Sequence, residues 1–300
     1  SMVGGLADWF AVVALFGTVG SGNFFQVNQA FDAVQIATGG DQSFLSGHAS
    51  RVVFGLVMAV LVGIVIIGGI RRIANVTDKL VPLMAAVYVL SCLFVIGVNI
   101  ELLPSAIGSI VKGAFSAEGV AGGALGTLLV GFRRAAFSNE AGIGSAPIAH
   151  ASVKTSEPMT EGLVAIWEPF IDTVVICSMT AITIVITGVY VGSSLNGVAL
   201  TSSAFSTVMP WFPYVLAVVV LMFAYSTMIA YAYYGTKAAT YLFGERRSVE
   251  VGYKLFYLSM TLIGVTLDFS QLVDFSDAIY FLMAVPNVIG LYLLAPVVKR

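Results

Sequence analysis

The stretch AFSNEAGIGSAP, residues 136–147, places a carboxylate and several helix-breaking residues within one long apolar segment. Residues 120–150 would measure about 46 Å as one helix at about 1.5 Å per residue, which exceeds the hydrocarbon core of about 30 Å. Gly142, Gly144 and Pro147 provide places where such a helix could be interrupted. An interruption exposes backbone N–H and C=O groups, which a membrane tolerates only beside a cavity or inside protein. The stretch therefore predicts a binding site halfway across a membrane.

The composition of the whole chain is that of a membrane protein. Of the 300 residues, 58% are hydrophobic and only 10% are charged, and the mean hydropathy is +0.96. Soluble domains carry roughly 25% charged residues. Because the deficit extends along the whole sequence, we predict a single transmembrane domain over residues 1–300. The net charge of −2 offers no basic surface for nucleic acid, and two histidines argue against a histidine-rich metal site.

Apolar segments of about 20 residues predict membrane-spanning helices. Eight such segments are expected, with a short external helix over residues 102–116. A turn-rich stretch and two prolines separate the fifth segment from the sixth, and Lys254 interrupts the seventh. The predicted fold class is therefore an all-α, polytopic membrane bundle of about eight spans. The expected spans are residues 8–35, 50–71, 77–100, 120–150, 160–190, 212–241, 249–267 and 271–297.

The distribution of lysine and arginine indicates how these spans are oriented. Eight spans put both ends of the chain on one side of the membrane, and cytoplasmic loops are rich in basic residues. Only Arg51 and Lys112 fall on the face opposite the termini, while Arg133 and Arg134 lie inside a segment. We therefore expect both termini in the cytoplasm. The basic residues on the side of the termini are Arg71, Arg72, Lys79, Lys154, Lys237, Arg246, Arg247, Lys254, Lys299 and Arg300.

Three polar clusters interrupt the apolar pattern, and the first is GTVGSGNFFQVNQ at residues 17–29. Its glycines mark a face that another backbone can approach closely. Asn23, Gln26 and Asn28 follow them, and the first two, three residues apart, should share a helix face. The alternative role of these amides is hydrogen bonding between packed helices, which contributes about 0.6 kcal/mol per bond.

The second cluster is Ser138, Asn139 and Glu140, at the expected interruption. The N-termini of half-helices attract carboxylates, and unwound carbonyl groups coordinate cations. A charged carboxylate at the bilayer centre costs about 2.5–3.5 kcal/mol on insertion scales, so Glu140 needs a partner or a wet cavity. The alternative is a re-entrant kink in which Glu140 pairs with Arg133 or Arg134.

The third cluster is FAYSTMIAYAYYGTK, residues 223–237, where Ser226 and Thr227 lie in mid-span. Hydroxyl oxygens suit a hard cation such as Na⁺. Taken alone, the commoner arrangement is a hydroxyl that bonds back to a carbonyl of its own helix. Three aspartates, Asp172, Asp274 and Asp277, lie near expected span ends and are given no direct part in binding.

At these clusters the sequence resembles a known family. The motif GFRRAAFSNEAGIGSAPIAHA strongly resembles the signature of the alanine or glycine:cation symporters, also called sodium:alanine symporters. GSGNFFQVNQAF, VGIVIIGGIRRIANVTDKLVP, FAYSTMIAYAYYG and MAVPNVIGLYLLAPVV resemble further segments of that family, in the same order and over nearly the whole chain. The resemblance implies the fold of the amino acid–polyamine–cation superfamily, in which two five-helix inverted repeats pack together and the first and sixth core helices are unwound halfway across the membrane.

By the order of these matches, the eight segments resemble core helices three to ten, with residues 120–150 as the broken sixth. The first two core helices have no match, so the chain is expected to be truncated at its N-terminus. Where the family commonly has tryptophan in the eighth core helix, this chain has Tyr231, which bears on the size of side chain that the pocket accepts. The resemblance implies that Asn23, Gln26, Asn28, Phe137, Ser138, Asn139, Glu140, Gly142 and Tyr231 belong to an amino-acid site, and that Ser226 and Thr227 belong to a sodium site.

The function that the resemblance implies is symport of a small neutral amino acid, alanine or glycine, into the cytoplasm. Na⁺ would be the coupling ion, no other cofactor would be needed, and the protein would lie in the plasma membrane of a bacterium or archaeon. A passive channel is the first alternative, but the sequence has no repeated filter-like element. An intramembrane serine hydrolase is the second. Ser145 and His150 differ by about 500° around a helix at about 100° per residue, so their side chains should point apart, and no enzyme is predicted.

Overall fold

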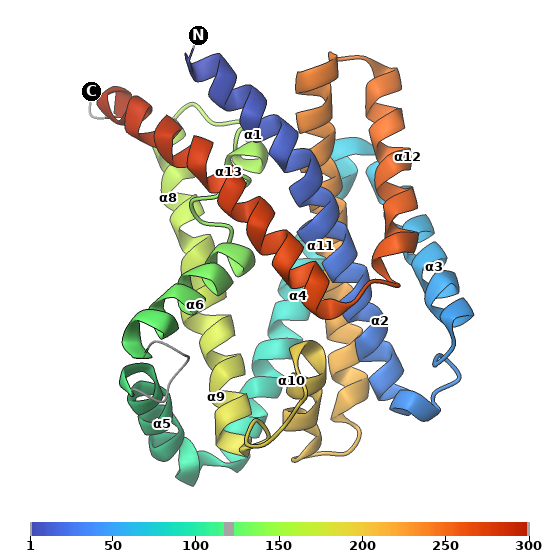
Figure 1. Ribbon diagram of the computed structural model, residues 1–300, viewed down its shortest axis with the longest axis vertical. Coiled ribbons are helices and arrows are strands. Elements are labelled where there is room, and N and C mark those ends of the chain that lie inside the picture. Colours follow the sequence, from blue (N-terminus) through green and yellow to red (C-terminus); the bar gives the residue numbers. More distant parts are fainter. Residues whose placement is uncertain (1, 117–122, 299–300) are drawn as a thin grey trace.

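The computed structural model describes residues 2–116 and 123–298, and every regular element in these ranges is a helix (Figure 1). The all-α prediction is therefore confirmed. The elements in chain order are α1 (Met2–Val19), the π-helix η1 (Gly20–Phe24), α2 (Phe25–Ala37), η2 (Gly40–Gln42), α3 (His48–Ile66), α4 (Gly69–Val98), η3 (Ile100–Leu102), α5 (Leu103–Phe115), α6 (Gly123–Ser138), α7 (Ala146–His150), α8 (Pro158–Pro169), the π-helix η4 (Phe170–Cys177), α9 (Ser178–Thr187), α10 (Gly197–Ser206), α11 (Phe212–Phe243), α12 (Arg247–Gly264) and α13 (Phe269–Val298).

Six helical runs in the described residues are long and apolar enough to cross a membrane. Two further expected spans do not meet that standard. Helix α12 carries Arg247, Glu250 and Lys254, and the segment expected over residues 120–150 is divided between α6 and α7. The six runs are Gly4–Ala37, His48–Ile66, Gly69–Val98, Pro158–Thr187, Phe212–Phe243 and Phe269–Pro296.

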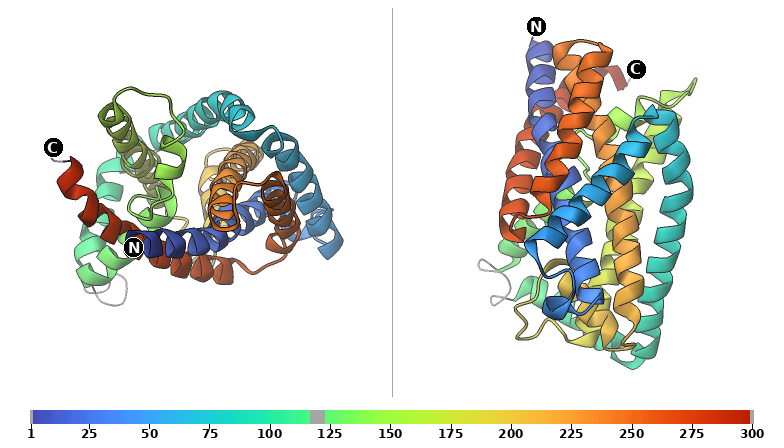
Figure 2. Two further views of the ribbon diagram at one scale, coloured as in Figure 1. Left: turned by 90° about the horizontal axis from the view of Figure 1, so that it is seen from above. Right: turned by 90° about the vertical axis from the view of Figure 1, so that its right-hand side faces the viewer.

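Helix α11 and the run from α1 to α2 form the centre of the bundle. The most apolar window is 61% buried in Gly4–Ala37 and 50% buried in Phe212–Phe243, against 11–39% in the other four runs. Helix α11 packs against α1 and α2, with Phe31, Met228 and Ile229 fully buried between them. Seen from above, the other helices surround α11 (Figure 2). These two elements therefore provide the frame for the polar clusters.

The outer helices expose large apolar side chains. Leu90 on α4, Trp167 on α8 and Tyr292 on α13 are 65%, 61% and 79% exposed. A contiguous apolar surface of this kind needs cover from lipid or protein. Both ends of the chain lie at the same end of the molecule (Figure 1), as an even number of crossings would require.

The structure differs from the predicted spans in two connections. Arg71 and Arg72 lie in the first turn of α4 instead of in a loop. The connection between the fifth and sixth expected spans contains a ten-residue helix, α10, which the sequence pattern did not indicate. Helix α10 packs on α2, α9 and α11 with Phe205 buried. Tertiary packing, and not its own periodicity, accounts for a helix this short.

Candidate functional site

The predicted interruption is present between α6 and α7. Helix α6 ends at Ser138, helix α7 begins at Ala146, and the residues between them are turns and bends. Glu140 has φ +58°, the one positive φ at a non-glycine residue in the described chain, and Gly142 has φ +84°. Left-handed backbone costs an L-residue about 1–2 kcal/mol, so the surrounding structure must hold Glu140 in place.

The interrupted segment is fixed to α1 and α13 through two glycines. At Gly144, with φ +93°, a Cβ atom would lie 2.7 Å from the ring of Phe10 and 3.0 Å from Cγ of Asn287. The Nδ2 of Asn287 donates a 2.8 Å hydrogen bond to the carbonyl of Gly142. This bond satisfies one backbone group that the helix break left free. This role of Asn287 became visible only in the structure.

Glu140 is held by hydroxyl groups. Ser145 Oγ donates to one carboxylate oxygen of Glu140, and Tyr231 OH donates to the other. The hydroxyl of Tyr231 lies 2.8 Å from that of Tyr280, which extends the network from α11 to α13. Glu140 therefore has two uncharged partners, Ser145 just before α7 and Tyr231 on α11, and Tyr280 on α13 supports the second.

The two arginines proposed as alternative partners of Glu140 bind another carboxylate. Arg133 Nη2 lies 2.9 Å from Asp277 Oδ2, and Arg134 pairs with the same carboxylate. The side chain of Asp277 is only 4% exposed. The alternative in which Glu140 pairs with Arg133 or Arg134 is thus wrong, and the arginines instead join α6 to the beginning of α13.

The last turn of α6 places three predicted site residues beside other elements. Phe137 packs edge-on against Phe25, with ring centroids 4.8 Å apart. Ser138 Oγ donates a 2.7 Å hydrogen bond to Asp172 Oδ2, and Asn139 Nδ2 donates a 2.7 Å bond to Thr173 Oγ1. The carboxylate of Asp172 lies midway along the run Pro158–Thr187 and not near a span end, so the expectation for its position was wrong.

The π-helix η1 brings the first polar cluster to this site. A Cβ atom on Gly22 would lie 2.1 Å from the ring of Tyr231, so only glycine lets that ring pack on the backbone. The glycines of this cluster thus admit side chains of α11 and α13, where the sequence suggested a backbone. Gln26, beside Phe25, donates a 3.0 Å hydrogen bond from Nε2 to the carbonyl of Ser21 across the π-turn.

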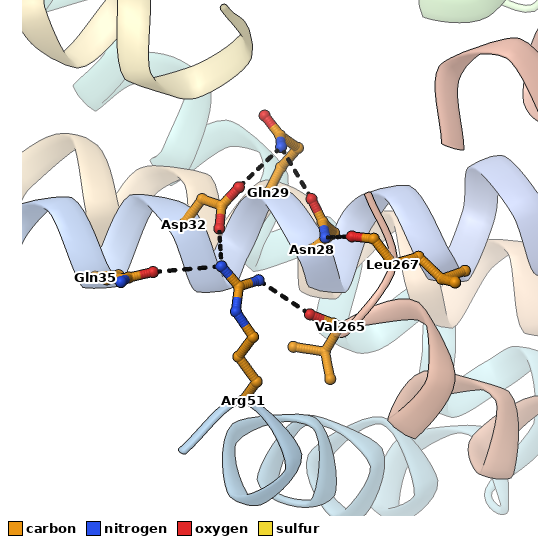
Figure 3. Close-up of polar contacts among 7 residues, drawn as sticks. All are labelled: Asn28, Gln29, Asp32, Gln35, Arg51, Val265 and Leu267. Atoms are coloured by element: carbon orange, nitrogen blue, oxygen red, sulfur yellow. Dashed lines mark hydrogen bonds and ion pairs between the residues drawn. The ribbon is translucent and has the colours of Figure 1, made fainter. Parts of the chain in front are cut away.

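The side chains of Asn23 and Asn28 form their hydrogen bonds outside this site. Asn23 is fully buried and its Nδ2 donates a 2.6 Å bond to the carbonyl of Tyr257 on α12. Because hydrogen bonds in a π-helix connect residues five apart, η1 separates Asn23 from Gln26 and the expected common face is lost. Asn28 Nδ2 donates a 2.8 Å bond to the carbonyl of Leu267, after α12 (Figure 3).

Figure 3 also shows how the outer half of α2 is anchored to its neighbours. Arg51 on α3 lies 3.2 Å from Asp32 Oδ1 and donates a 3.1 Å bond to the carbonyl of Val265. Gln29 accepts a 3.1 Å bond from the backbone N–H of Val198 at the beginning of α10. These contacts tie α2, α3, α10 and the end of α12 together, so this network supports the frame and lies apart from the interruption.

The two residues predicted for a sodium site lie on α11. Ser226 Oγ donates a 2.9 Å bond to the carbonyl of Phe223 in its own helix and lies 3.7 Å from the sulfur of Met84. Thr227 is half-buried, and its hydroxyl has no hydrogen-bond partner among the described residues. Ser226 thus follows the commoner arrangement, while Thr227 keeps its oxygen free.

Two cavities adjoin the interruption. One of about 230 Å³ has a lining that includes Gly142, Ile143, Tyr280, Arg133 and Asp277. A second, of about 360 Å³, lies between α1, α7, α11 and α13. Its lining is apolar except for Lys237, Asn287 and Tyr241. Gly142, Ile143 and Gly144 of the interruption therefore line open space.

Ser145 and His150 do not form a nucleophile–base pair. Ser145 donates to Glu140, whereas His150 Nδ1 lies 2.6 Å from Glu161 Oε1 and His150 Nε2 lies 3.2 Å from Glu168 Oε1. A catalytic serine needs the base within hydrogen-bond reach. The two residues face different partners, as their spacing in the sequence predicted.

The chain is similar to known proteins over most of its length. Residues 3–300 match the model of the family described as "Sodium:alanine symporter family". The chain is 36% identical over 296 residues to "Sodium/alanine symporter AgcS" of Methanococcus maripaludis, covering 96% of this chain and 62% of that protein. It is 34% identical to "Amino-acid carrier protein AlsT" of Bacillus subtilis, covering 98% of this chain and 62% of that protein. It is 37% identical to "Probable sodium/glutamine symporter GlnT" of Bacillus subtilis, covering 83% of this chain and 52% of that protein.

Proposed function

The chain belongs to the sodium:alanine symporter family, and from that premise we propose that it forms the greater part of a Na⁺-coupled symporter for a small neutral amino acid. Transport runs into the cytoplasm, across the plasma membrane of a bacterium or archaeon. The observation that carries this proposal is the interruption between Ser138 and Ala146, with its cavities and its hydroxyl-bound carboxylate. The chain spans about 62% of the length of the archaeal relative, so the activity belongs to the complete protein.

The amino-acid site in this proposal lies at the end of α6. Free backbone N–H groups at a helix break bind a carboxylate, and side-chain amides and carboxylates bind an ammonium group. The contact between Phe25 and Phe137 supports a place for Gln26 in the same site. We leave Asn23 and Asn28 out because their amides bond to the backbone in or after α12. The proposed residues are Gln26, Phe137, Ser138, Asn139, Glu140, Gly142 and Tyr231.

Coupling in this proposal depends on a Na⁺ site that includes Ser226 and Thr227. Na⁺ and the amino acid each raise the other's affinity by the same factor, as linkage requires. The unbonded hydroxyl of Thr227 supports its role as an oxygen ligand. Alanine and glycine both fall within the proposed class, and one relative is named as a probable sodium/glutamine symporter.

The proposed topology is one transmembrane domain with eight crossings and both termini in the cytoplasm. It adds α12 and the pair α6–α7 to the six long apolar runs. Together these would be core helices three to ten of a five-plus-five inverted-repeat transporter. A channel has less support, because a passive pore needs no interrupted helix beside a hydroxyl-bound carboxylate.

Alanine uptake by the complete protein in liposomes tests the amino-acid site. Gln26→Ala and Asn139→Ala should each abolish Na⁺-driven alanine uptake without loss of protein from the membrane. Gln271→Ala and Asn75→Ala, which make the same changes at exposed positions, should transport normally. Normal uptake by both site variants would contradict the assigned site. Uptake against a concentration gradient by the unmodified protein separates symport from passive flow.

A further inference from the structure

A third cavity lies between α1, α11 and α12, and its lining includes no residue of the interruption. Its volume of about 590 Å³ exceeds that of either cavity beside the interruption. Among its described lining residues, Tyr253 is the one with a hydroxyl, and that hydroxyl lies 2.7 Å from Thr18 Oγ1. The other lining side chains are aliphatic, aromatic or those of glycine and methionine. The cavity therefore suits an apolar ligand and not an ion or an amino acid.

The cavity is a groove that is open on the outside of the bundle. Phe16, Phe243 and Phe256 belong to its lining and are 55%, 65% and 48% exposed. A Cβ atom added at Gly252, another lining residue, would meet no atom within 4 Å. Exposed apolar surface of this kind faces lipid or protein. An acyl chain of the surrounding membrane can therefore enter the groove from the side.

The length of the groove matches the thickness of one leaflet. Along α12 its lining extends from Val249 to Met260, which is about 16 Å at about 1.5 Å per residue. Half of a hydrocarbon core of about 30 Å is about 15 Å. A single acyl chain that begins at the Val249 end therefore has room for its length along α12.

Two arginines lie at the Val249 end of the groove. Arg246 and Arg247 follow the end of α11 and begin α12, and the lining residues Phe243 and Val249 are within three positions of them on either side. This connection lies at the end of the molecule that carries both termini (Figure 1). Both arginines are exposed, and neither side chain forms an ion pair or a hydrogen bond with any described residue. Two guanidinium groups are thus available next to the opening of an apolar groove.

The acidic residues nearby leave this end of the groove with a net positive charge. Glu250 pairs with Lys254, so Glu245 alone stands against the two arginines. A guanidinium binds a phosphate group through two parallel hydrogen bonds. The charge at the opening and the apolar lining behind it therefore complement the headgroup and the tail of an anionic phospholipid.

We propose that the groove holds one acyl chain of an anionic phospholipid from the surrounding membrane, and that Arg246 and Arg247 bind its phosphate. A lipid tail gains little by moving from the bilayer into the groove, because both surroundings are apolar. The preference for an anionic headgroup therefore comes from the arginines, each of which raises the affinity about fivefold. This site is separate from the amino-acid and Na⁺ sites and does not rest on the proposed function.

Lipid binding to the complete protein, freed of lipid in detergent, tests the headgroup contact. Phosphatidylglycerol and phosphatidylcholine with the same acyl chains provide the anionic and the zwitterionic probe, and native mass spectrometry counts the bound lipids. The unmodified protein should bind one phosphatidylglycerol about 25-fold more tightly than phosphatidylcholine.

Arg246→Gln with Arg247→Gln should abolish this preference. Arg71→Gln with Arg72→Gln, the same change at an exposed pair on α4, should leave it intact. Equal affinities for the two lipids in the unmodified protein, or an unchanged preference in the variant at Arg246 and Arg247, overturns the proposal.

A variant that fills the groove tests the place of the acyl chain. Gly252→Leu puts a side chain into the open space within α12 and should weaken the binding of both lipids. Gly162→Leu on α8, where an added Cβ also meets nothing within 4 Å, should bind both lipids normally. Unchanged lipid binding by Gly252→Leu would mean that the chain lies elsewhere and would refute the proposed groove.

A measurement on the unmodified protein covers a failure of Gly252→Leu to fold. Phosphatidylglycerol with a photoreactive diazirine on its acyl chain, in liposomes that contain the complete protein, should label Phe256 or Met260. Excess unlabelled phosphatidylglycerol should suppress this labelling, whereas phosphatidylcholine should not. Labelling that is absent from α12 contradicts the proposal, because another part of the complete protein then fills the groove.

Discussion

The polar side chains of helix α11 and those of the interrupted pair α6–α7 have different kinds of hydrogen-bond partner. On α11, Ser226 and Thr236 donate to carbonyl groups of their own helix, at 2.9 Å from Phe223 O and 2.6 Å from Ala232 O. Around the interruption, Ser138 and Asn139 bond to residues of η4, more than 30 positions along the chain. Both segments are apolar runs with hydroxyls and aromatic residues nearby, so their composition alone does not separate them.

The difference follows from the backbone. In a continuous helix, Ser and Thr hydroxyls can donate to carbonyl groups of the same helix. Such hydroxyls need no hydrogen-bond partner in another element. A helix that ends in mid-membrane loses those acceptors, so its side chains and its free backbone groups must find partners in other elements or in a ligand. The three predictions that follow test this contrast, from the largest expected effect to the smallest.

The largest effect is expected where α6 is fixed to α13. Replacing both Arg133 and Arg134 by glutamine leaves the buried carboxylate of Asp277 without a counter-charge. Removal of a partner from a buried pair costs about 3–5 kcal/mol, and the half-exposed arginines favour the lower end, about 3 kcal/mol. The apparent melting temperature in detergent should fall clearly.

Arg246→Gln with Arg247→Gln provides the matched control, because these adjacent arginines are exposed. That pair should shift the melting temperature little. An equal shift in both double variants would mean that the contacts with Asp277 contribute nothing specific.

The backbone of the interruption should be the next most sensitive feature. Gly144→Ala forces an L-residue into φ +93° and brings its Cβ against Phe10 and Asn287. We expect a loss of about 2 kcal/mol of stability from the strained backbone, and a reduction of alanine uptake of about tenfold or more because the loop moves. Gly162→Ala on α8 meets nothing within 4 Å and should be neutral or stabilising. Normal uptake by Gly144→Ala would show that the loop geometry is dispensable.

The smallest effects are expected on α11. Ser226→Ala removes a hydrogen bond within one helix and should change stability by about 1 kcal/mol or less. Thr227→Ala removes a hydroxyl that has no protein partner, so stability should hold while the Na⁺ concentration for half-maximal uptake rises. An unchanged Na⁺ dependence would remove Thr227 from the proposed sodium site. Ser226→Ala should also raise that concentration, because Ser226 belongs to the same proposed site; an unchanged value would leave its bond to Phe223 as its only role.

The helix break itself could be predicted from the sequence. An apolar segment too long for the membrane, with Gly142, Gly144 and Pro147 within it, leaves few alternatives. Glu140 was also correctly marked, since a carboxylate in such a segment needs partners. Its partners could not be predicted, because the approach of Ser145 and of Tyr231 depends on how the broken segment folds and packs on α11. The mid-span position of Asp172 could not be predicted either, because it depends on where the helical run Pro158–Thr187 begins.

The sequence by itself determined that this chain is an apolar helical protein with an interruption near residue 140, because hydropathy and backbone breakers are local properties. The tertiary structure decided which polar groups surround that interruption. It directed Asn23 and Asn28 to the α12 region, joined Arg133 and Arg134 to Asp277, and placed Asp172 beside Ser138. The physical reason is that a buried polar group must find a partner, and packing alone determines which groups come within hydrogen-bond distance.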